Sequence, residues 1–354
     1  MANIFMREKS PVSAPKAVGM TARDPEVAVL DVTAMPRGAV GDIAVDGASG
    51  VVVTTNPGDR SISVMDADLG AATVVAVGGE ATLVAVAEDR AYVATSSLQH
   101  DAVTVVDTRA GTVIARYPLA FSATAMAITA DGKRLYIGRT GDDMVDVAVV
   151  DTTAERIGTI GIGYRPGASV DAVRVDATGR RLYVATTGLA GSALLTVDTE
   201  TTRVVRRLRL ASPIRDLALG ADGLAYVLRS DRRYGGSIDV VDLAANAVTA
   251  SVAIGGAPTQ LAVSPDGTRA YVVDYDRVAV FDTMTTQIVD EISGDAAPAC
   301  VAVRGDGRRL YVADFAGAMT SLAVPASTMA LTYSPFVATD RIARPDVREL
   351  TAAV

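Results

Sequence analysis

The chain is built from short apolar runs that are separated by turn residues. The clearest stretch, residues 255–290, contains four such runs, and each is rich in Val, Ile or Tyr. Runs of this length and composition, bounded by Gly, Pro and Asp, are typical of strands, whereas a helix would repeat its apolar positions with a period near 3.6. The pattern therefore predicts four consecutive strands in this stretch.

This four-strand unit recurs along the chain. Seven copies cover residues 36–77, 78–119, 120–162, 163–210, 211–254, 255–294 and 295–327. The second strand of six units carries a tyrosine: Tyr92, Tyr136, Tyr183, Tyr226, Tyr271 and Tyr311. Four-strand units at this spacing are typical of β-propeller blades, which pack against their neighbours because one blade cannot bury both of its faces. We predict an all-β, seven-bladed β-propeller of four-stranded antiparallel blades over residues 25–334.

The two ends of the chain suggest how the ring closes. Residues 27–33 form a lone strand pattern before the first unit, and the last unit shows only three clear strands. We expect the N-terminal strand to complete the last blade, so that no sheet edge is left free at the junction. A competing interpretation gives this role to residues 328–333. Residues 1–24 then form a flexible leader and residues 335–354 a C-terminal tail.

Two sets of repeated aspartates are interpreted as turn residues. Asp-Gly pairs follow the first strand at 131–132, 222–223, 266–267 and 306–307, and an aspartate ends the third strand at Asp66, Asp107, Asp151, Asp198, Asp242 and Asp282. Glycine supplies positive φ and aspartate bonds the local backbone in such turns. In antiparallel blades these turns share one face, and the more variable second-to-third loops share the other. We therefore expect any binding site on the variable-loop face, at the mouth of the central channel.

Several charged residues break the repeat. Arg174 replaces a small residue of the first strands, Ala44, Ala85, Ala127, Ala218, Ala262 and Ala302. An arginine near the channel needs a carboxylate or water, and Asp171 or Asp176 is the carboxylate that we expect to pair with it. A second set of equivalent positions lies three residues after each tyrosine, where the second strands end. It includes two arginines, Arg139 and Arg229, and two aspartates, Asp274 and Asp314. With Arg215, these positions give the candidate ligand-binding set Arg139, Asp171, Arg174, Arg215, Arg229, Asp274 and Asp314. A structural ion pair and a solvated rim are the alternatives.

The loop at residues 230–236 is the most interaction-like segment. It contains Arg232, Arg233 and Tyr234 beside two glycines. Arg and Tyr are enriched at interface hot spots. A long solvated loop is the alternative interpretation.

The repeats resemble a known family. Pro258 to Gly267, followed by Ala270-Tyr271-Val272-Val273, is similar to the YVTN repeat of bacterial seven-bladed propellers, as is Leu310-Tyr311-Val312-Ala313. The first unit departs from the pattern with Val52 in place of tyrosine, and the seventh lacks the terminal aspartate. The resemblance implies a propeller whose ligands are mostly undefined.

Composition narrows the functional classes. The chain of 354 residues has a formal charge of −8 and 5% aromatic residues, which disfavours nucleic acid and anionic membrane surfaces. His100 is the only histidine and Cys300 the only cysteine, so a metal site with several His or Cys ligands is excluded. We find no nucleophile elbow and no P-loop, and we expect no cofactor.

These observations favour a non-catalytic binding or scaffolding propeller, with a protein or a small polar or anionic ligand as partner. The alternative is a lactonase-like hydrolase of a small sugar lactone, because some similar propellers open lactones. Arg174, Arg139, Arg229 and His100 would then take part. The chain has no apolar stretch long enough for a signal peptide or a membrane span. We expect a cytoplasmic monomer, or an envelope location if the start is misassigned.

Overall fold

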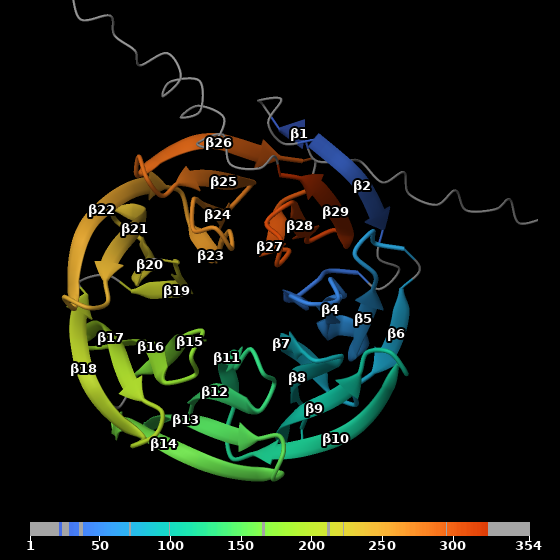
Figure 1. Cartoon of the computed structure of the whole chain (residues 1–354), viewed down its shortest axis with the longest axis horizontal. Helices are drawn as coiled ribbons and strands as arrows, with labels where there is room; N and C mark the ends of the chain where they lie inside the picture. Colours follow the sequence, from blue (N-terminus) through green and yellow to red (C-terminus); the bar gives the residue numbers. More distant parts are fainter. Residues whose placement is uncertain are drawn as a thin grey trace, which may run out of the picture.

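The computed structural model describes residues 21–22, 28–34, 38–70, 72–98, 100–164, 167–210, 213–221, 223–294 and 296–324. Over these residues, seven antiparallel sheets stand around one axis, which Figure 1 views end-on. Consecutive strands are neighbours within each sheet, from the inner strand outward. The predicted seven-bladed propeller of four-stranded blades is confirmed.

The blades follow the chain in order. Blade one holds β3 (Ile43–Val45), β4 (Val52–Asn56), a 3-10 turn η1 (Pro57–Asp59), β5 (Ser61–Met65) and β6 (Thr73–Ala76). Blade two holds β7 (Glu80–Ala87), β8 (Arg90–Ser96), β9 (Asp101–Asp107) and β10 (Thr112–Leu119), and blade three β11 (Ala123–Ile128), β12 (Arg134–Thr140), β13 (Met144–Asp151) and β14 (Arg156–Tyr164). Blade four holds β15 (Ser169–Val175), β16 (Arg181–Gly188), β17 (Gly191–Asp198) and β18 (Arg203–Leu210). Blade five holds β19 (Ile214–Leu219), β20 (Leu224–Asp231), β21 (Gly235–Asp242) and β22 (Ala247–Gly255).

The last two blades include strands from the start of the chain. Blade six holds β23 (Pro258–Val263), β24 (Arg269–Asp274), β25 (Arg277–Asp282) and β26 (Gln287–Ser293), with β1 (Thr21–Ala22) as a fifth strand. Blade seven holds β27 (Pro298–Val303), β28 (Arg309–Asp314) and β29 (Ala318–Ala323), with β2 (Ala28–Ala34) outermost.

The ring closes as predicted. β2 pairs antiparallel with β29, and its partners run from Ala28 opposite Ala323 to Ala34 opposite Ala318. A strand from the N-terminal part of the chain thus shares one sheet with the last described strand, and β29 has no free edge. The pairing of β1 with β26 was not predicted. The competing strand at 328–333 and the tail lie outside the described residues.

The core lies between the blades. Each second strand is central in its sheet and has neighbouring blades on both faces, so it is almost continuously buried. Tyr92, Tyr136, Tyr271 and Tyr311 are at most 1% exposed. The Tyr311 hydroxyl donates a hydrogen bond to the Ala67 carbonyl at 2.7 Å and links blade seven to blade one.

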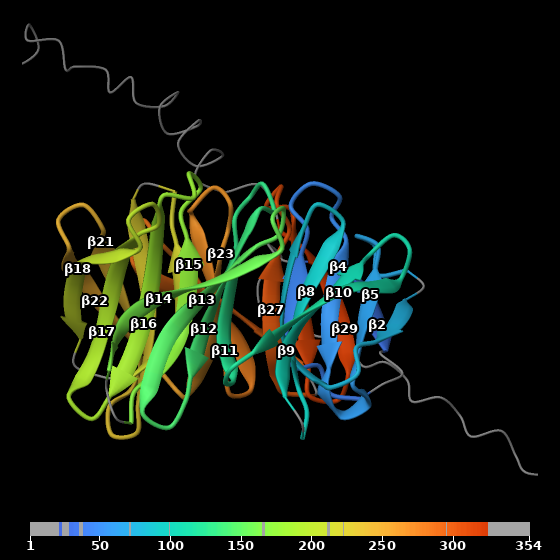
Figure 2. The ribbon, with the colours of Figure 1, turned by 90° about the horizontal axis from the view of Figure 1, so that it is seen from below.

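The repeated aspartates close turns, as expected. Gly132 and Gly267 have φ of +64° and +71°. Asp282 accepts the amide N–H groups of Met284 and Thr285 at 3.0 and 2.8 Å, and the corresponding residue of each earlier blade accepts amide N–H groups in the same way. Figure 2 shows the disc from the side, with strands running between its two faces. One face therefore carries the stereotyped turns and the other carries the variable loops.

Candidate functional site

A polar cavity of about 310 Å³ lies on the propeller axis. Its lining comes from the first strands of all seven blades or from the residues just before them. These strands begin where the link from the preceding blade enters, so the cavity lies toward the variable-loop face. Three predicted site residues line it: Asp171, Arg174 and Arg215.

Arg174 forms an ion pair across two blades. Its Nη2 lies 2.8 Å from Oδ1 of Asp216, which is on the inner strand of blade five, and Nη1 donates to the Val173 carbonyl at 2.8 Å. The predicted pairing with Asp171 or Asp176 is wrong. Asp171 instead accepts the Ser169 hydroxyl at 2.6 Å, and Asp176 accepts the Arg180 amide N–H of its own turn at 2.9 Å.

Polar side chains also join adjacent inner strands. Asp42 Oδ2 accepts the Val84 amide N–H at 3.0 Å, and Asp216 Oδ2 accepts that of Leu261 at 2.8 Å. Gln260 Oε1 repeats this contact one blade further on. The three acceptors occupy equivalent positions, two residues before the alanine column. Sequence reasoning missed them, although each stands where other blades have Leu, Ala or Cys.

Burial raises the proton affinity of the carboxyl groups in this cavity. It raises the pKa of Asp42 to about 6, against the opposing effects of the Val84 and Ile43 amides and Arg174. Burial also raises the pKa of Asp216, and Arg174 opposes this. The pKa of Asp171 is raised by burial and lowered in part by Ser169 and by Arg215. The cavity therefore combines guanidinium groups with carboxyl groups that hold protons unusually well.

The two second-strand arginines of the predicted set lie elsewhere. Arg139 is 6% exposed and forms a two-pronged ion pair with Asp146 on β13, with both N···O distances 2.8 Å. Its guanidinium lies 4.5 Å from the centre of the Phe121 ring. Arg229 pairs with Asp239 on β21 in the same manner, with Nη2 2.7 Å from Oδ1. Both arginines therefore join strands inside their own blades.

The two predicted aspartates at the ends of second strands, Asp274 and Asp314, also bond to nearby groups of their own blades. Asp274 is 3% exposed, accepts the Ala257 amide N–H at 2.7 Å and lies 3.3 Å from Nη2 of Arg277. Asp314 accepts the Ala318 amide N–H at 2.8 Å. The structure thus brings Asp171, Arg174 and Arg215 together and does not bring these two aspartates to the cavity.

The predicted interaction loop lies between β20 and β21. Tyr234 is 74% exposed, and the Arg233 guanidinium lies 5.4 Å from the centre of its ring. Asp231 Oδ1 accepts the amide N–H groups of Arg233 and Tyr234, which fixes the turn and leaves Arg232 exposed.

The corresponding loops of other blades also present large apolar side chains, which sequence reasoning missed. These side chains stand at or beside the second-to-third loops and are Leu98, Met144, Leu189, Tyr275 and Phe315, with exposed fractions from 54% to 107%. Met284 is the only exposed large hydrophobic in the described turns of the opposite face. The variable-loop face is therefore the more apolar of the two faces at its tips.

Within the described ranges, no group of three or more His, Cys, Asp or Glu residues is arranged to hold a metal ion. No helix in the described part of the chain is both long and apolar enough to cross a membrane.

Seven antiparallel blades around a polar axial cavity define a β-propeller protein. The chain is 33% identical over 298 residues to the seven-bladed beta-propeller protein Rv1057 of Mycobacterium tuberculosis, and the match covers 72% of this chain and 74% of that protein. The chain belongs to this family of seven-bladed β-propeller proteins. No family model matches the sequence. The fold is also similar to Kuenenia stuttgartiensis hydrazine synthase, with a TM-score of 0.73, 18% identity, and coverage of 83% of this chain and 98% of that one, a likeness that concerns the fold alone.

Proposed function

We propose that this protein is a non-catalytic binding propeller whose channel mouth takes a small polar ligand. The observation that carries the proposal is that the Arg215 side chain is accessible and unpaired among the described residues. Its side chain lines the axial cavity and is exposed, and it has no hydrogen-bond or ion-pair partner in the described part of the chain. Arg174, by contrast, is already engaged by Asp216. Arg215 is therefore the cation that a ligand can reach.

The cavity chemistry favours a hydroxylated or anionic ligand. A guanidinium binds oxyanions and hydroxyl oxygens through several N–H groups at once. Asp171 beside it can accept a hydroxyl proton, and the cavity volume is at the small end of the range for ligand sites. A compact polar molecule fits this combination better than an apolar one.

The same face supports a scaffolding role. The exposed apolar side chains of its loops, with Arg232, Arg233 and Tyr234, have the residue types found at protein interfaces. The likeness of the repeats to the YVTN type agrees with a binding function. We expect a monomer in the cytoplasm that engages a protein or small-ligand partner through this face.

A thermal-shift screen tests the proposal. The panel contains sugars, polyols and small organic acids, and a ligand that binds the native state raises the melting temperature in a concentration-dependent way. We expect at least one such shift, its loss in Arg215→Ala, and its retention in Arg203→Ala, which removes an exposed arginine from the outer strand β18. A panel without any shift, or shifts that Arg215→Ala leaves intact, would contradict the channel site.

One observation favours the lactonase-like alternative. Asp42 has a pKa of about 6 and lies near Arg174 in the cavity. A carboxylate of this kind can take a proton from a water molecule as that water attacks a lactone carbonyl, and a guanidinium can stabilise the resulting oxyanion. The carboxylic acid can then return the proton to the ring oxygen as the ring C–O bond breaks. Of the expected participants, Arg174 alone lines the cavity. Lactone turnover that Asp42→Asn abolishes would replace the binding proposal, and an inactive lactone panel would remove the alternative.

A further inference from the structure

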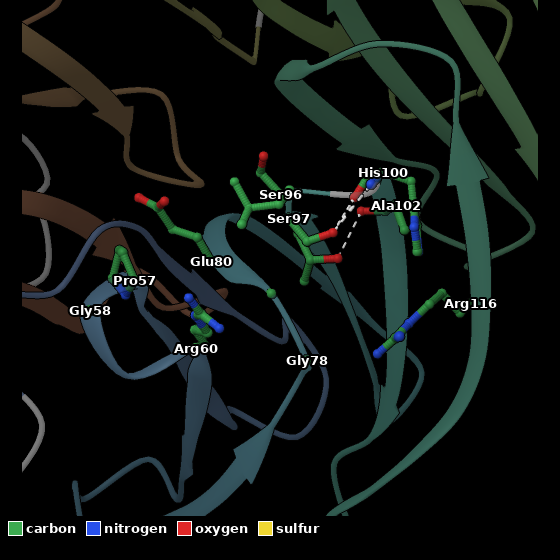
Figure 3. A pocket seen from close by; sticks show the side chains of 13 residues that line it. Pro57, Gly58, Arg60, Gly78, Glu80, Ser96, Ser97, His100, Ala102 and Arg116 are labelled. Atoms are coloured by element: carbon green, nitrogen blue, oxygen red, sulfur yellow. Dashed lines mark hydrogen bonds between the residues drawn. The ribbon is translucent and has the colours of Figure 1, made fainter.

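A second cavity opens on the variable-loop face between blades one and two. Its volume is about 770 Å³, and it shares no lining residue with the axial cavity. Figure 3 shows its walls, which come from η1 and the residue after it, from the link at 78–79 with the first residue of β7, from the end of β8 with the following loop, and from β9 and β10. Nothing in the proposed channel function uses this cavity.

Two glycines shape one wall of this cavity. Gly78 has φ of +76°, and a Cβ there would stand 2.8 Å from Nη2 of Arg116. A Cβ on Gly79 would stand 2.8 Å from the Ser96 carbonyl oxygen. The backbone at Gly78 and Gly79 therefore passes close to Arg116 and to the Ser96 carbonyl group, and the absence of side chains on the two glycines makes room for the Arg116 guanidinium.

Arg116 is held in place beside this link. Although it lies on the outer strand β10, its Nη2 donates to the Val77 carbonyl at 2.8 Å and its Nε donates to the Thr104 hydroxyl at 3.2 Å. These two bonds fix the plane of the guanidinium at the cavity wall. In Figure 3, Arg116 and Arg60 lie on opposite sides of the segment that carries Gly78. The cavity is thus flanked by two arginines from adjacent blades.

The side chains of Thr95 and Ser97 bond to neighbouring groups of the cavity wall, whereas three charged or titratable side chains of this cavity are unpaired in the described part of the chain. Arg60 has a fixed backbone, because its carbonyl accepts the Val77 amide N–H at 3.0 Å, yet its side chain is exposed. Across the residues that the structure describes, the side chains of Arg60, Glu80 and His100 have no hydrogen-bond or ion-pair partner. This differs from Arg139, Arg174 and Arg229, each of which is neutralised by an aspartate.

This set of groups indicates the chemistry of the ligand. Arg60 and Arg116 with Glu80 give a formal charge of +1, which one carboxylate balances, whereas a phosphate dianion would leave excess negative charge beside Glu80. Guanidinium forks bind carboxylates in two-pronged geometry. Glu80 and the Ser96 hydroxyl remain to bond hydroxyl groups of the same molecule. We propose that this pocket binds a small hydroxylated carboxylic acid through Arg60 and Arg116.

Calorimetric titration of the full chain tests this proposal, with D-gluconate and D-glucuronate as probes. D-Glucose and acetate carry the hydroxyl groups and the carboxylate separately, and we expect both to bind more weakly than either probe. Arg60→Ala should weaken gluconate binding about tenfold or more, since it removes a charged hydrogen-bond donor. Arg60→Lys should recover part of the loss, because it restores the charge without the fork. Arg90→Ala, an exposed arginine at the opposite end of blade two, should bind as the wild type does.

Three outcomes would overturn the proposal. The first is the absence of measurable binding by both acids, and the second is unchanged binding in Arg60→Ala. The third is tighter binding of D-glucose 6-phosphate than of gluconate, which would assign a phosphate group instead. Arg215→Ala separates this pocket from the axial cavity: gluconate binding that depends on Arg215 and not on Arg60 belongs to the channel, and the reverse dependence supports the pocket even if the channel binds nothing.

Discussion

The elevated pKa of Asp42 predicts an unusual dependence of stability on pH. The folded-state pKa is about 6, compared with a usual value of 3.8. The folded protein therefore binds this proton more tightly than the unfolded chain does. The unfolding free energy must rise as pH falls toward the usual value, and this gain is lost as pH rises through the folded-state pKa.

The expected size follows from the two pKa values. Between about pH 7.5 and pH 5, proton linkage at Asp42 alone gives a gain of roughly 1.4 kcal/mol in unfolding free energy. The pKa values of Asp171 and Asp216 are also raised, so they add to the gain in the same direction. Asp151, whose pKa is lowered by the Ala154 and Thr153 amides, changes stability only at lower pH.

Urea unfolding at a series of pH values tests this reasoning. Asp42→Asn cannot ionise, so we expect the pH-dependent gain to shrink by about 1.4 kcal/mol relative to the wild type. The carboxamide of this variant can accept only one of the two amide N–H groups that Asp42 accepts, which costs about 1 kcal/mol at every pH and leaves the slope unaffected. Asp151→Asn is the matched control and should keep the wild-type slope in this range. An unchanged slope in Asp42→Asn would refute the account of the channel electrostatics.

Three further predictions concern residues that stabilise the blades and the closure of the ring. Arg139→Met leaves Asp146 buried without its cation and should lower the unfolding free energy, measured in urea, by about 3–5 kcal/mol, and the double variant Arg139→Met with Asp146→Leu should recover most of this loss. A loss under about 1 kcal/mol in Arg139→Met would contradict a structural role for Arg139. Gly256→Ala places a Cβ at φ of +61° where it clashes with the Asp274 carboxylate, so we expect the unfolding free energy to fall by about 2 kcal/mol. Gly158→Ala, whose Cβ would meet open space, should leave the unfolding free energy nearly unchanged, and equal losses in the two variants would contradict this prediction. Removal of residues 1–34 exposes the edge of β29, so it should lower the melting temperature and cause self-association that size-exclusion chromatography detects, with removal of residues 1–20 as the control. A variant without residues 1–34 that stays monomeric and melts at the wild-type temperature would contradict the role of β2.

The fold could be predicted from the sequence because its elements are local and repeated. The tyrosines of six second strands and the aspartates of the turns mark the same positions in successive blades, and the aspartates bond amide groups only a few residues away. The placement of β2 could also be predicted, since the last blade lacked one strand. The pairing of β1 with β26 could not, because two residues carry no pattern.

The site was harder to predict because its contacts join blades. The partner of Arg174 is 42 residues away, on the next inner strand, so a search among nearby carboxylates chose the wrong residues. Arg139 was expected at the rim because it ends a strand, yet Asp146 stands directly opposite it in the strand register. Asp42, Asp216 and Gln260 share an alignment column, and attention to polar residues in that otherwise apolar column would have found them.

The most direct test of the channel site is a crystal structure of the protein with the strongest ligand from the thermal-shift screen. We predict density for the ligand in the axial cavity, within hydrogen-bond distance of the Arg215 guanidinium and the Asp171 carboxylate. Ligand density confined to other surfaces, with the axial cavity unchanged, would contradict the channel as the binding site.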